Sequence, residues 1–175
     1  MISVDEKYMR MCFALAKKGY GKAAPNPMVG CVVLDSDGNL ISKGYHKKYG
    51  ENHAERDALL KLKNNEAEGG TLYVNLEPCS HFGKTPPCVD LIIKHKLKRV
   101  VIGMKDVNPK VDGITKLKAA GIEVDCVLEE EARFLNRMFI KTMTEKMPYV
   151  VLKTASTMDG KIASKTGSSK WITSE

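Results

Sequence analysis

The sequence predicts an α/β fold in which helices cover both faces of a mostly parallel sheet. A β-branched run at 29–34 and a second run at 40–45 flank the turn residues 36–39, which predicts a hairpin. After this hairpin, strand-like and helix-like segments alternate, an order typical of parallel sheets covered on both faces. With 175 residues and 43% hydrophobic content, the chain can bury a core without disulfides.

The individual elements follow from hydrophobic spacing and from the residues that interrupt it. Helices are expected where apolar residues recur at helical spacing, at 5–18, 53–62, 88–95, 114–120 and 129–142. The remaining strands are expected at the runs 71–76, 99–103 and 122–128. Pro25-Asn26-Pro27 cannot continue a helix and predicts a rigid loop. Met147-Pro148 interrupts the chain again, and a new strand is expected at 149–154.

Charge and composition limit the partners and the compartment. The net charge of +7 favours anionic partners, but the basic residues are scattered, and nucleic acid is not expected. No apolar run approaches the roughly 18–20 residues that span a bilayer, so no membrane partner is expected. The N-terminus lacks a signal-peptide pattern, which predicts a cytoplasmic protein. Of five cysteines, Cys12, Cys31 and Cys126 are expected as small core residues.

The remaining two cysteines form a metal-binding pattern with one histidine. His53 and the thiols of Cys79 and Cys88 offer one imidazole and two thiolates, a set that suits one Zn²⁺ ion per chain. Three protein ligands leave a fourth position for water. Glu55, two residues after the histidine, is placed to move a proton of that water without binding the metal.

Two plainer interpretations of the same residues stay open at this point. The zinc site could be closed and structural, with His81 as its fourth ligand. Alternatively, His53 and the two cysteines could be unrelated core residues. The first of these leaves Glu55 without a role beside the metal.

Several motifs together resemble one enzyme family. Zinc-dependent nucleobase deaminases carry H-x-E followed by P-C-x-x-C, and here eight residues separate the two cysteines. Residues 76–88, LEPCSHFGKTPPC, resemble the deaminase half of the bifunctional riboflavin-biosynthesis deaminase–reductase family. The resemblance also rests on further motifs in the same order, which are found at 25–27, 44–46, 106–109, 152–160 and 169–173.

This resemblance implies a fold and a reaction. The fold is a cytidine-deaminase-like three-layer α/β/α sandwich with a mixed, mostly parallel five-stranded sheet. The reaction is hydrolytic deamination of the phosphorylated pyrimidine 2,5-diamino-6-(5-phosphoribosylamino)pyrimidin-4(3H)-one to 5-amino-6-(5-phosphoribosylamino)uracil. Glu55 is the expected proton shuttle, which serves the water, the ring nitrogen and the leaving ammonia. A homo-oligomer is also expected.

The resemblance further implies substrate contacts outside the metal centre. The expected substrate-binding residues of the deaminase part are Asn26, His46, His81, Lys84, Asp106 and Asn108. Plainer roles stay open for several of them: a turn residue for Asn26, structural histidines for His46 and His81, a solvated loop lysine for Lys84, and turn chemistry at 108–109.

The last part of the chain resembles the beginning of a reductase domain. We expect a deaminase domain at 1–147 and a reductase fragment at 148–175. Ala155 and Trp171 match positions that contact the cofactor NADPH in the family, and Ser169 matches a substrate contact. These roles need a complete reductase domain, so we expect deamination without reduction.

Two other functions remain as alternatives. One is a tRNA adenosine deaminase or free-nucleotide deaminase on the same scaffold, although its two-residue cysteine spacing is absent. The other is a zinc-stabilised RNA-binding module without catalysis, which Glu55 and the open coordination position disfavour.

Overall fold

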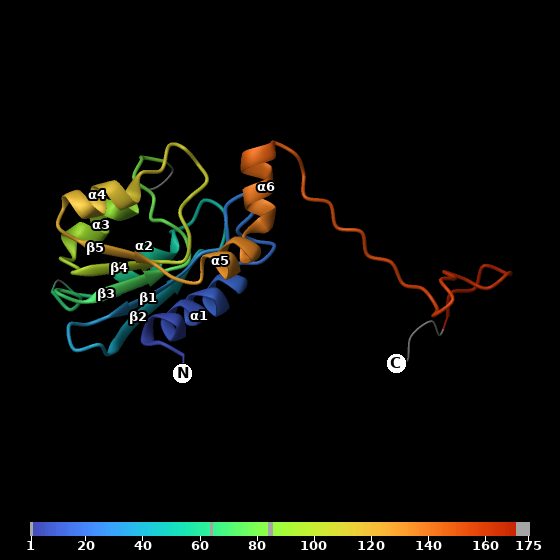
Figure 1. Cartoon of the computed structure of the whole chain (residues 1–175), viewed down its shortest axis with the longest axis horizontal. Helices are drawn as coiled ribbons and strands as arrows, with labels where there is room; N and C mark the ends of the chain where they lie inside the picture. Colours follow the sequence, from blue (N-terminus) through green and yellow to red (C-terminus); the bar gives the residue numbers. More distant parts are fainter. Residues whose placement is uncertain (1, 64, 84–85, 171–175) are drawn as a thin grey trace.

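The centre of the protein is one five-stranded mixed sheet with the strand order β2-β1-β3-β4-β5 (Figure 1). The computed structural model describes residues 2–63, 65–83 and 86–170. The strands are β1 (Gly30–Leu34), β2 (Leu40–Tyr45), β3 (Thr71–Val74), β4 (Arg99–Ile102) and β5 (Glu123–Cys126).

The directions of the strands determine which strand ends lie at the same edge of the sheet. β1 pairs antiparallel with both β2 and β3, whereas β3, β4 and β5 pair in parallel. One strand, β1, therefore runs opposite to the other four. The carboxyl ends of β3 and β4 lie at one edge, which is where α/β proteins place their ligands.

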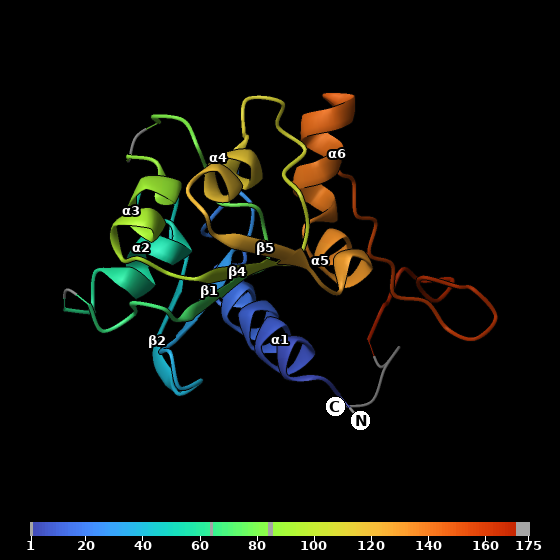
Figure 2. The same cartoon turned by 60° about the vertical axis from the view of Figure 1, so that its left-hand side comes forward.

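Helices cover both faces of this sheet (Figure 2). They are α1 (Val4–Lys17), α2 (Ala54–Leu59), α3 (Cys88–Lys94), α4 (Gly113–Ala119), α5 (Glu129–Leu135) and α6 (Arg137–Glu145). α2, α3 and α4 lie on one face, and α1 and α5 lie on the other. The three-layer α/β/α sandwich and its mixed sheet are confirmed.

The first helix shows how sequence sets local structure here. Ser3 and Glu6 form a capping box, in which each side chain accepts a hydrogen bond from the backbone N–H of the other. Beyond the cap, the buried residues of α1 recur at helical spacing, and they are Met9, Cys12, Phe13, Leu15 and Ala16. Local sequence thus determines both where this helix begins and which face it buries.

Two glycines allow both helical layers to touch the β1–β2 pair closely. A Cβ atom at Gly30 would lie 2.2 Å from the carbonyl oxygen of Cys12 in α1. A Cβ atom at Gly44 would lie 2.5 Å from the carbonyl oxygen of Ala54 in α2. Both distances are shorter than any side chain can accept, so α1 and α2 lie directly against the strand backbones.

Two expected elements are wrong. The helix expected at 129–142 is divided into α5 and α6 at Asn136, whose backbone departs from helix geometry with φ −101° and ψ 18°. The side chain of Asn136 is hydrogen-bonded to the backbone of Met28, and such bonds compete with regular helix geometry. The strand expected at 149–154 is absent from the described chain, where this segment has no sheet partner and leads away from the body (Figure 1).

The expectation that Cys126 is a core residue is also wrong. Its side chain is exposed, whereas Cys12 and Cys31 are buried as expected. Cys126 ends β5, an edge strand, and its thiol donates a hydrogen bond to the carbonyl oxygen of Gly103 at 3.4 Å. In the part of the chain that the structure describes, no helix is long and apolar enough to cross a membrane.

An ion-pair network joins α1 to the parallel half of the sheet. The Arg99 guanidinium donates two hydrogen bonds to the Asp5 carboxylate, each 2.9 Å long, and also bonds Asp125. The Tyr73 hydroxyl donates to Asp5 at 2.7 Å. Hydrogen bonding from Arg99 lowers the pKa of Asp5 below its ordinary value. The network therefore stabilises the fold while Asp5 is ionised.

Replacement Asp5→Asn tests this network through the pH dependence of stability. We expect a loss of about 1 kcal/mol in the free energy of unfolding at pH 7, since the pair is partly exposed. The folded-state pKa of Asp5 is lowered, so its contribution is full above the ordinary value and is lost as pH falls below about 4. Urea unfolding of both proteins between pH 7 and pH 3 should show the difference shrinking. A difference in unfolding free energy that stays constant with pH, or an equal loss of stability in Asp37→Asn, would show that the Asp5 ion pair does not stabilise the fold.

Candidate metal centre and active-site cavity

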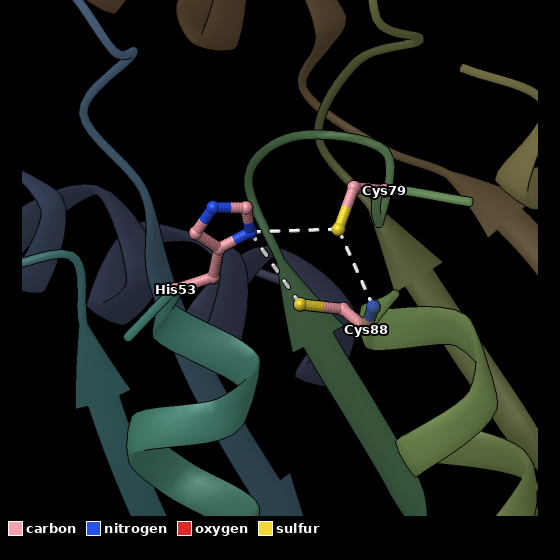
Figure 3. Close-up of side chains that lie close together, drawn as sticks. All are labelled: His53, Cys79 and Cys88. Carbon is pink, nitrogen blue, oxygen red and sulfur yellow. Dashed lines mark hydrogen bonds between the residues drawn. The ribbon is translucent and has the colours of Figure 1, made fainter. Parts of the chain in front are cut away.

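One imidazole and two thiols converge between the starts of two helices (Figure 3). His53 is the residue that precedes α2, and its backbone is extended there, with φ −65° and ψ 162°. Cys88 is the first residue of α3, and Cys79 lies in the loop after β3. The Nδ1 atom of His53 lies 3.5 Å from the Cys79 sulfur and 3.6 Å from the Cys88 sulfur.

Backbone hydrogen bonds hold the two cysteines together despite the longer loop between them. The backbone N–H of Cys88 donates to the sulfur of Cys79 at 3.3 Å. The next N–H, that of Val89, donates to the carbonyl oxygen of Cys79 at 3.2 Å. The start of α3 thus binds Cys79 at two atoms, and both sulfurs face the same point.

The donor set fits a zinc ion. One atom from each of His53, Cys79 and Cys88 lies within 4.8 Å of the other two. Two sulfurs and one imidazole nitrogen at this spacing are ligands that zinc takes in tetrahedral sites. Glu55 and His81 are outside this group of described donors, so the group has three members rather than four.

The protonation of these donors favours one thiolate before any metal binds. Hydrogen bonds from Cys88 and His53 lower the pKa of Cys79 to about 4. The same contact with Cys79, together with burial, raises the pKa of the Cys88 thiol. A metal that binds both sulfurs must displace the proton on Cys88, so metal affinity falls with falling pH.

Glu55 is a buried acid beside this centre. Its side chain is only 3% exposed, and burial followed by the charge of Cys79 raises the pKa of Glu55 to about 7. A carboxyl group with a pKa near the working pH can both accept and release a proton. It lies in the first turn of α2, two residues from His53.

The metal centre and Glu55 open into a cavity of about 390 Å³. The cavity is lined by most of the residues predicted from the sequence, namely Asn26, His46, His53, Glu55, Cys79, His81, Asp106 and Asn108. Cys88 is buried behind this surface. Residues from five separate parts of the chain therefore meet at one site.

His46 and Asn26 are joined by a hydrogen bond whose direction follows from the neighbours. His46 is 2% exposed, and burial lowers the pKa of its ring below the ordinary value. Its Nδ1 lies 3.0 Å from the carbonyl oxygen of Asn52, which can only accept, so Nδ1 carries the proton. Nε2 of the neutral ring then accepts from the Asn26 amide nitrogen at 3.1 Å. Oδ1 of Asn26 remains as an acceptor on the cavity wall.

A buried carboxylate that sequence reasoning missed holds the loop of Asp106 and Asn108. Glu77 is 3% exposed and accepts the backbone N–H groups of Asp106 and Ile114, each at 3.0 Å. Burial raises the pKa of Asp106 above its ordinary value. The only sequence signal for Glu77 is its position directly before Pro78-Cys79.

Other predicted residues are not brought to the cavity. Lys84 and Trp171 lie outside the described residues. Ala155 and Ser169 are exposed, and they lie in the segment that leads away from the sheet (Figure 1). Their expected roles in a reductase therefore stay predictions.

The lining also includes side chains to which the sequence analysis gave no role. Tyr49 and Glu51 come from the loop between β2 and α2, and Phe139 and Met143 come from α6. The apolar pattern of α6 was visible in the sequence, but a helix facing a cavity cannot be distinguished from one facing a core by pattern alone.

Comparison with known proteins identifies the family. The model of the cytidine and deoxycytidylate deaminase zinc-binding region matches residues 2–104. The chain belongs to this family. The zinc-binding deaminase domain and the cytidine-deaminase-like fold are thereby confirmed, and the two helix starts of Figure 3 lie within the matched region.

Individual relatives of this deaminase domain are longer proteins. The chain is 52% identical to riboflavin biosynthesis protein RibD of Aquifex aeolicus over 175 residues, which cover 98% of this chain and 49% of the relative. A Thermotoga maritima diaminohydroxyphosphoribosylaminopyrimidine deaminase/5-amino-6-(5-phosphoribosylamino)uracil reductase is 50% identical, with a TM-score of 0.91 over 97% of this chain and 50% of that one. The chain therefore spans about half the length of these relatives.

A shorter relative has been solved with a ligand. Rib2 deaminase of Aspergillus oryzae, in complex with DARIPP, is 25% identical, with a TM-score of 0.67. The match covers 82% of this chain and 95% of that chain. That solved chain is a C-terminal deletion mutant of Rib2 deaminase, so its length is not that of the whole protein.

The metal centre predicts a selective effect of Cys88→Ser. Loss of one thiolate from a three-ligand site should weaken zinc binding more than about 100-fold. This is more than the roughly 10–100-fold that is lost when a residue hydrogen-bonded to a metal ligand is replaced. Competition with a zinc-chelating dye measures the affinity. The matched control is Cys126→Ser, which removes an exposed thiol outside the donor group. Equal zinc affinity in the two variants would contradict the assignment.

Proposed function

We propose that this chain is a zinc-dependent deaminase of riboflavin biosynthesis. It converts 2,5-diamino-6-(5-phosphoribosylamino)pyrimidin-4(3H)-one and water into 5-amino-6-(5-phosphoribosylamino)uracil and ammonia. The observation that carries the proposal is the buried Glu55 carboxyl, which lines one cavity with His53 and Cys79, while Cys88, the third donor, lies buried behind that surface. The similarity to RibD proteins supports the choice of pyrimidine.

His53, Cys79 and Cys88 are the residues that would hold the zinc ion. When bound there, zinc would lower the pKa of a water molecule, which would make that water a nucleophile at neutral pH. The carboxylate of Glu55 takes a proton from the attacking water, whose oxygen forms a bond to the ring carbon that bears the amine. Glu55 returns this proton to the adjacent ring nitrogen. Glu55 then takes the proton of the newly attached hydroxyl and passes it to the amine, and the carbon–nitrogen bond breaks to release ammonia as the hydroxyl becomes a carbonyl.

The cavity wall supplies groups for binding the pyrimidine. Asn26 offers its Oδ1 as an acceptor for a ring N–H or amine, because its amide nitrogen is already bonded to His46. His81, Asp106 and Asn108 lie on the wall and offer further polar groups. Phe139 and Met143 add apolar surface for a flat ring.

The phosphate has no cationic partner among the described lining residues, which include no lysine or arginine. Lys84 stays a predicted substrate-binding residue on sequence grounds, and it lies outside the described residues. The division into a deaminase domain at 1–147 and a reductase fragment at 148–175 also stays a prediction, as do the homo-oligomer, the cytoplasmic location and the lack of a nucleic-acid partner.

Replacement Glu55→Gln tests the proton shuttle. The amide keeps the shape of the side chain but cannot carry the proton, so kcat should fall at least about 100-fold. Zinc content should stay that of the unmodified protein, because Glu55 is outside the donor group. Metal analysis and ammonia release measure the two effects, with the exposed Glu123→Gln as control. Joint loss of zinc and activity would assign Glu55 to the metal instead.

Substrate choice is tested by ammonia release from competing substrates. The zinc-loaded chain should release ammonia from the diaminopyrimidine phosphate and accumulate the aminouracil phosphate. Cytidine, dCMP and tRNA should give no release above the enzyme-free rate. NADPH absorbance should stay constant. Faster release from tRNA or a nucleotide would favour another deaminase activity, and RNA retention without turnover would favour a binding module.

A further inference from the structure

Two buried asparagines bind the peptide groups around Met28. Asn136, 2% exposed, accepts the Met28 N–H at 2.8 Å and donates to the Met28 carbonyl oxygen at 3.0 Å. Asn75, fully buried, donates to the same carbonyl oxygen at 3.0 Å and accepts the Gly30 N–H at 2.7 Å. Side-chain amides thus take the place of a strand partner just before β1 begins.

Met28 is where the Pro25-Asn26-Pro27 loop joins the sheet. Pro25 and Pro27 have no N–H group, so the loop has few backbone donors with which to fix itself. Within it, the Asn26 N–H donates to the carbonyl oxygen of Ala23 at 3.0 Å. On the other side, the loop is held through Met28. By binding Met28, the Asn136 amide therefore helps to fix the position of Asn26, two residues earlier in the loop.

Asn136 also stands at the junction between α5 and α6. Its backbone has φ −101° and ψ 18°, outside regular helix geometry. α6 follows immediately and carries Phe139 and Met143, which line the cavity. No residue of α6 is buried, and Ile140 is the residue through which this helix packs, partly buried, against the hydrophobic core. The Asn136 side chain is thus bonded to the loop of Asn26, and it stands at the start of the helix whose Phe139 and Met143 line the same cavity.

We propose that Asn136 is a positioning residue for substrate binding, a role that rests on the proposed function. It ties the loop of Asn26 to the start of α6, two segments that line the cavity, without itself lining it. Asn26 is in turn bonded to His46, so the acceptor it offers to the pyrimidine has a fixed direction. The described hydrogen bonds of the Asn136 side chain go to Met28 and not to the zinc donors, which come from α2, α3 and the loop after β3.

Replacement Asn136→Ala tests the proposal by the split between KM and kcat. KM for the diaminopyrimidine phosphate should rise about 10-fold, as expected from losing one well-placed hydrogen bond to substrate. The value of kcat should change less than about threefold, and zinc content should not change. Asn136→Asp keeps the acceptor for the Met28 N–H but places a carboxylate oxygen against the Met28 carbonyl oxygen, so it should raise KM at least as much.

Tyr73→Phe is the matched control, because it removes one hydrogen bond from β3 outside the cavity lining. A KM rise in Asn136→Ala no larger than in Tyr73→Phe would overturn the proposal. Amide hydrogen exchange gives a readout that needs no turnover. The Met28 N–H should exchange at least about 10-fold faster in Asn136→Ala than in the unmodified protein.

The two measurements separate this proposal from the proposed function. If the unmodified chain releases no ammonia, the proposed function fails, and the Met28 exchange rate still decides whether Asn136 holds the loop. If ammonia is released and both KM and Met28 exchange stay unchanged in Asn136→Ala, the positioning role fails alone. Asn136→Asp supplies the same comparison should Asn136→Ala not fold.

Discussion

The site depends on how closely α2 lies against β2. At Gly44 a side chain has no room, because its Cβ would lie 2.5 Å from the Ala54 carbonyl oxygen and 2.6 Å from the Ala58 nitrogen. This contact places the first turn of α2 over the end of the strand, with Glu55 in that turn and His53 directly before it. Since α3 packs beside α2, Cys88 arrives at the same point. Helix packing on the sheet, more than any local loop, therefore assembles the donors.

Cys79 and Glu55 are neighbouring acidic groups, and their different surroundings shift their pKa values in opposite directions. The Cys79 thiol has a pKa lowered to about 4 by its hydrogen bonds, whereas burial raises the pKa of Glu55 to about 7. One group is poised to be a ligand and the other to carry a proton. The cavity adds oriented amides and an apolar wall, so the same pocket can hold a flat ring while a proton moves.

The metal centre was predictable from sequence because its signal is local. The residue types and spacing of His53, Glu55, Cys79 and Cys88 are enough to indicate zinc-assisted deamination. The resemblance added Asn26 and His46, which the structure places on one wall. The break at Asn136 was not predictable, because it depends on a bond to Met28, 108 residues away. Glu77 was missed because its partners, the backbone N–H groups of Asp106 and Ile114, come from later parts of the chain. Phe139 and Met143 were missed because an apolar helix pattern does not show whether it faces a cavity or a core, and Cys126 because β5 is an edge strand.

The central claim is a zinc ion with three protein ligands and one open position beside Glu55. Crystals of the zinc-loaded chain, with diffraction data collected on both sides of the zinc absorption edge, test it directly. The account predicts one anomalous peak bonded to His53 Nδ1 and to the sulfurs of Cys79 and Cys88, at about 2.0–2.3 Å, with a non-protein fourth ligand. A fourth bond to His81 or to the Glu55 carboxylate would contradict it.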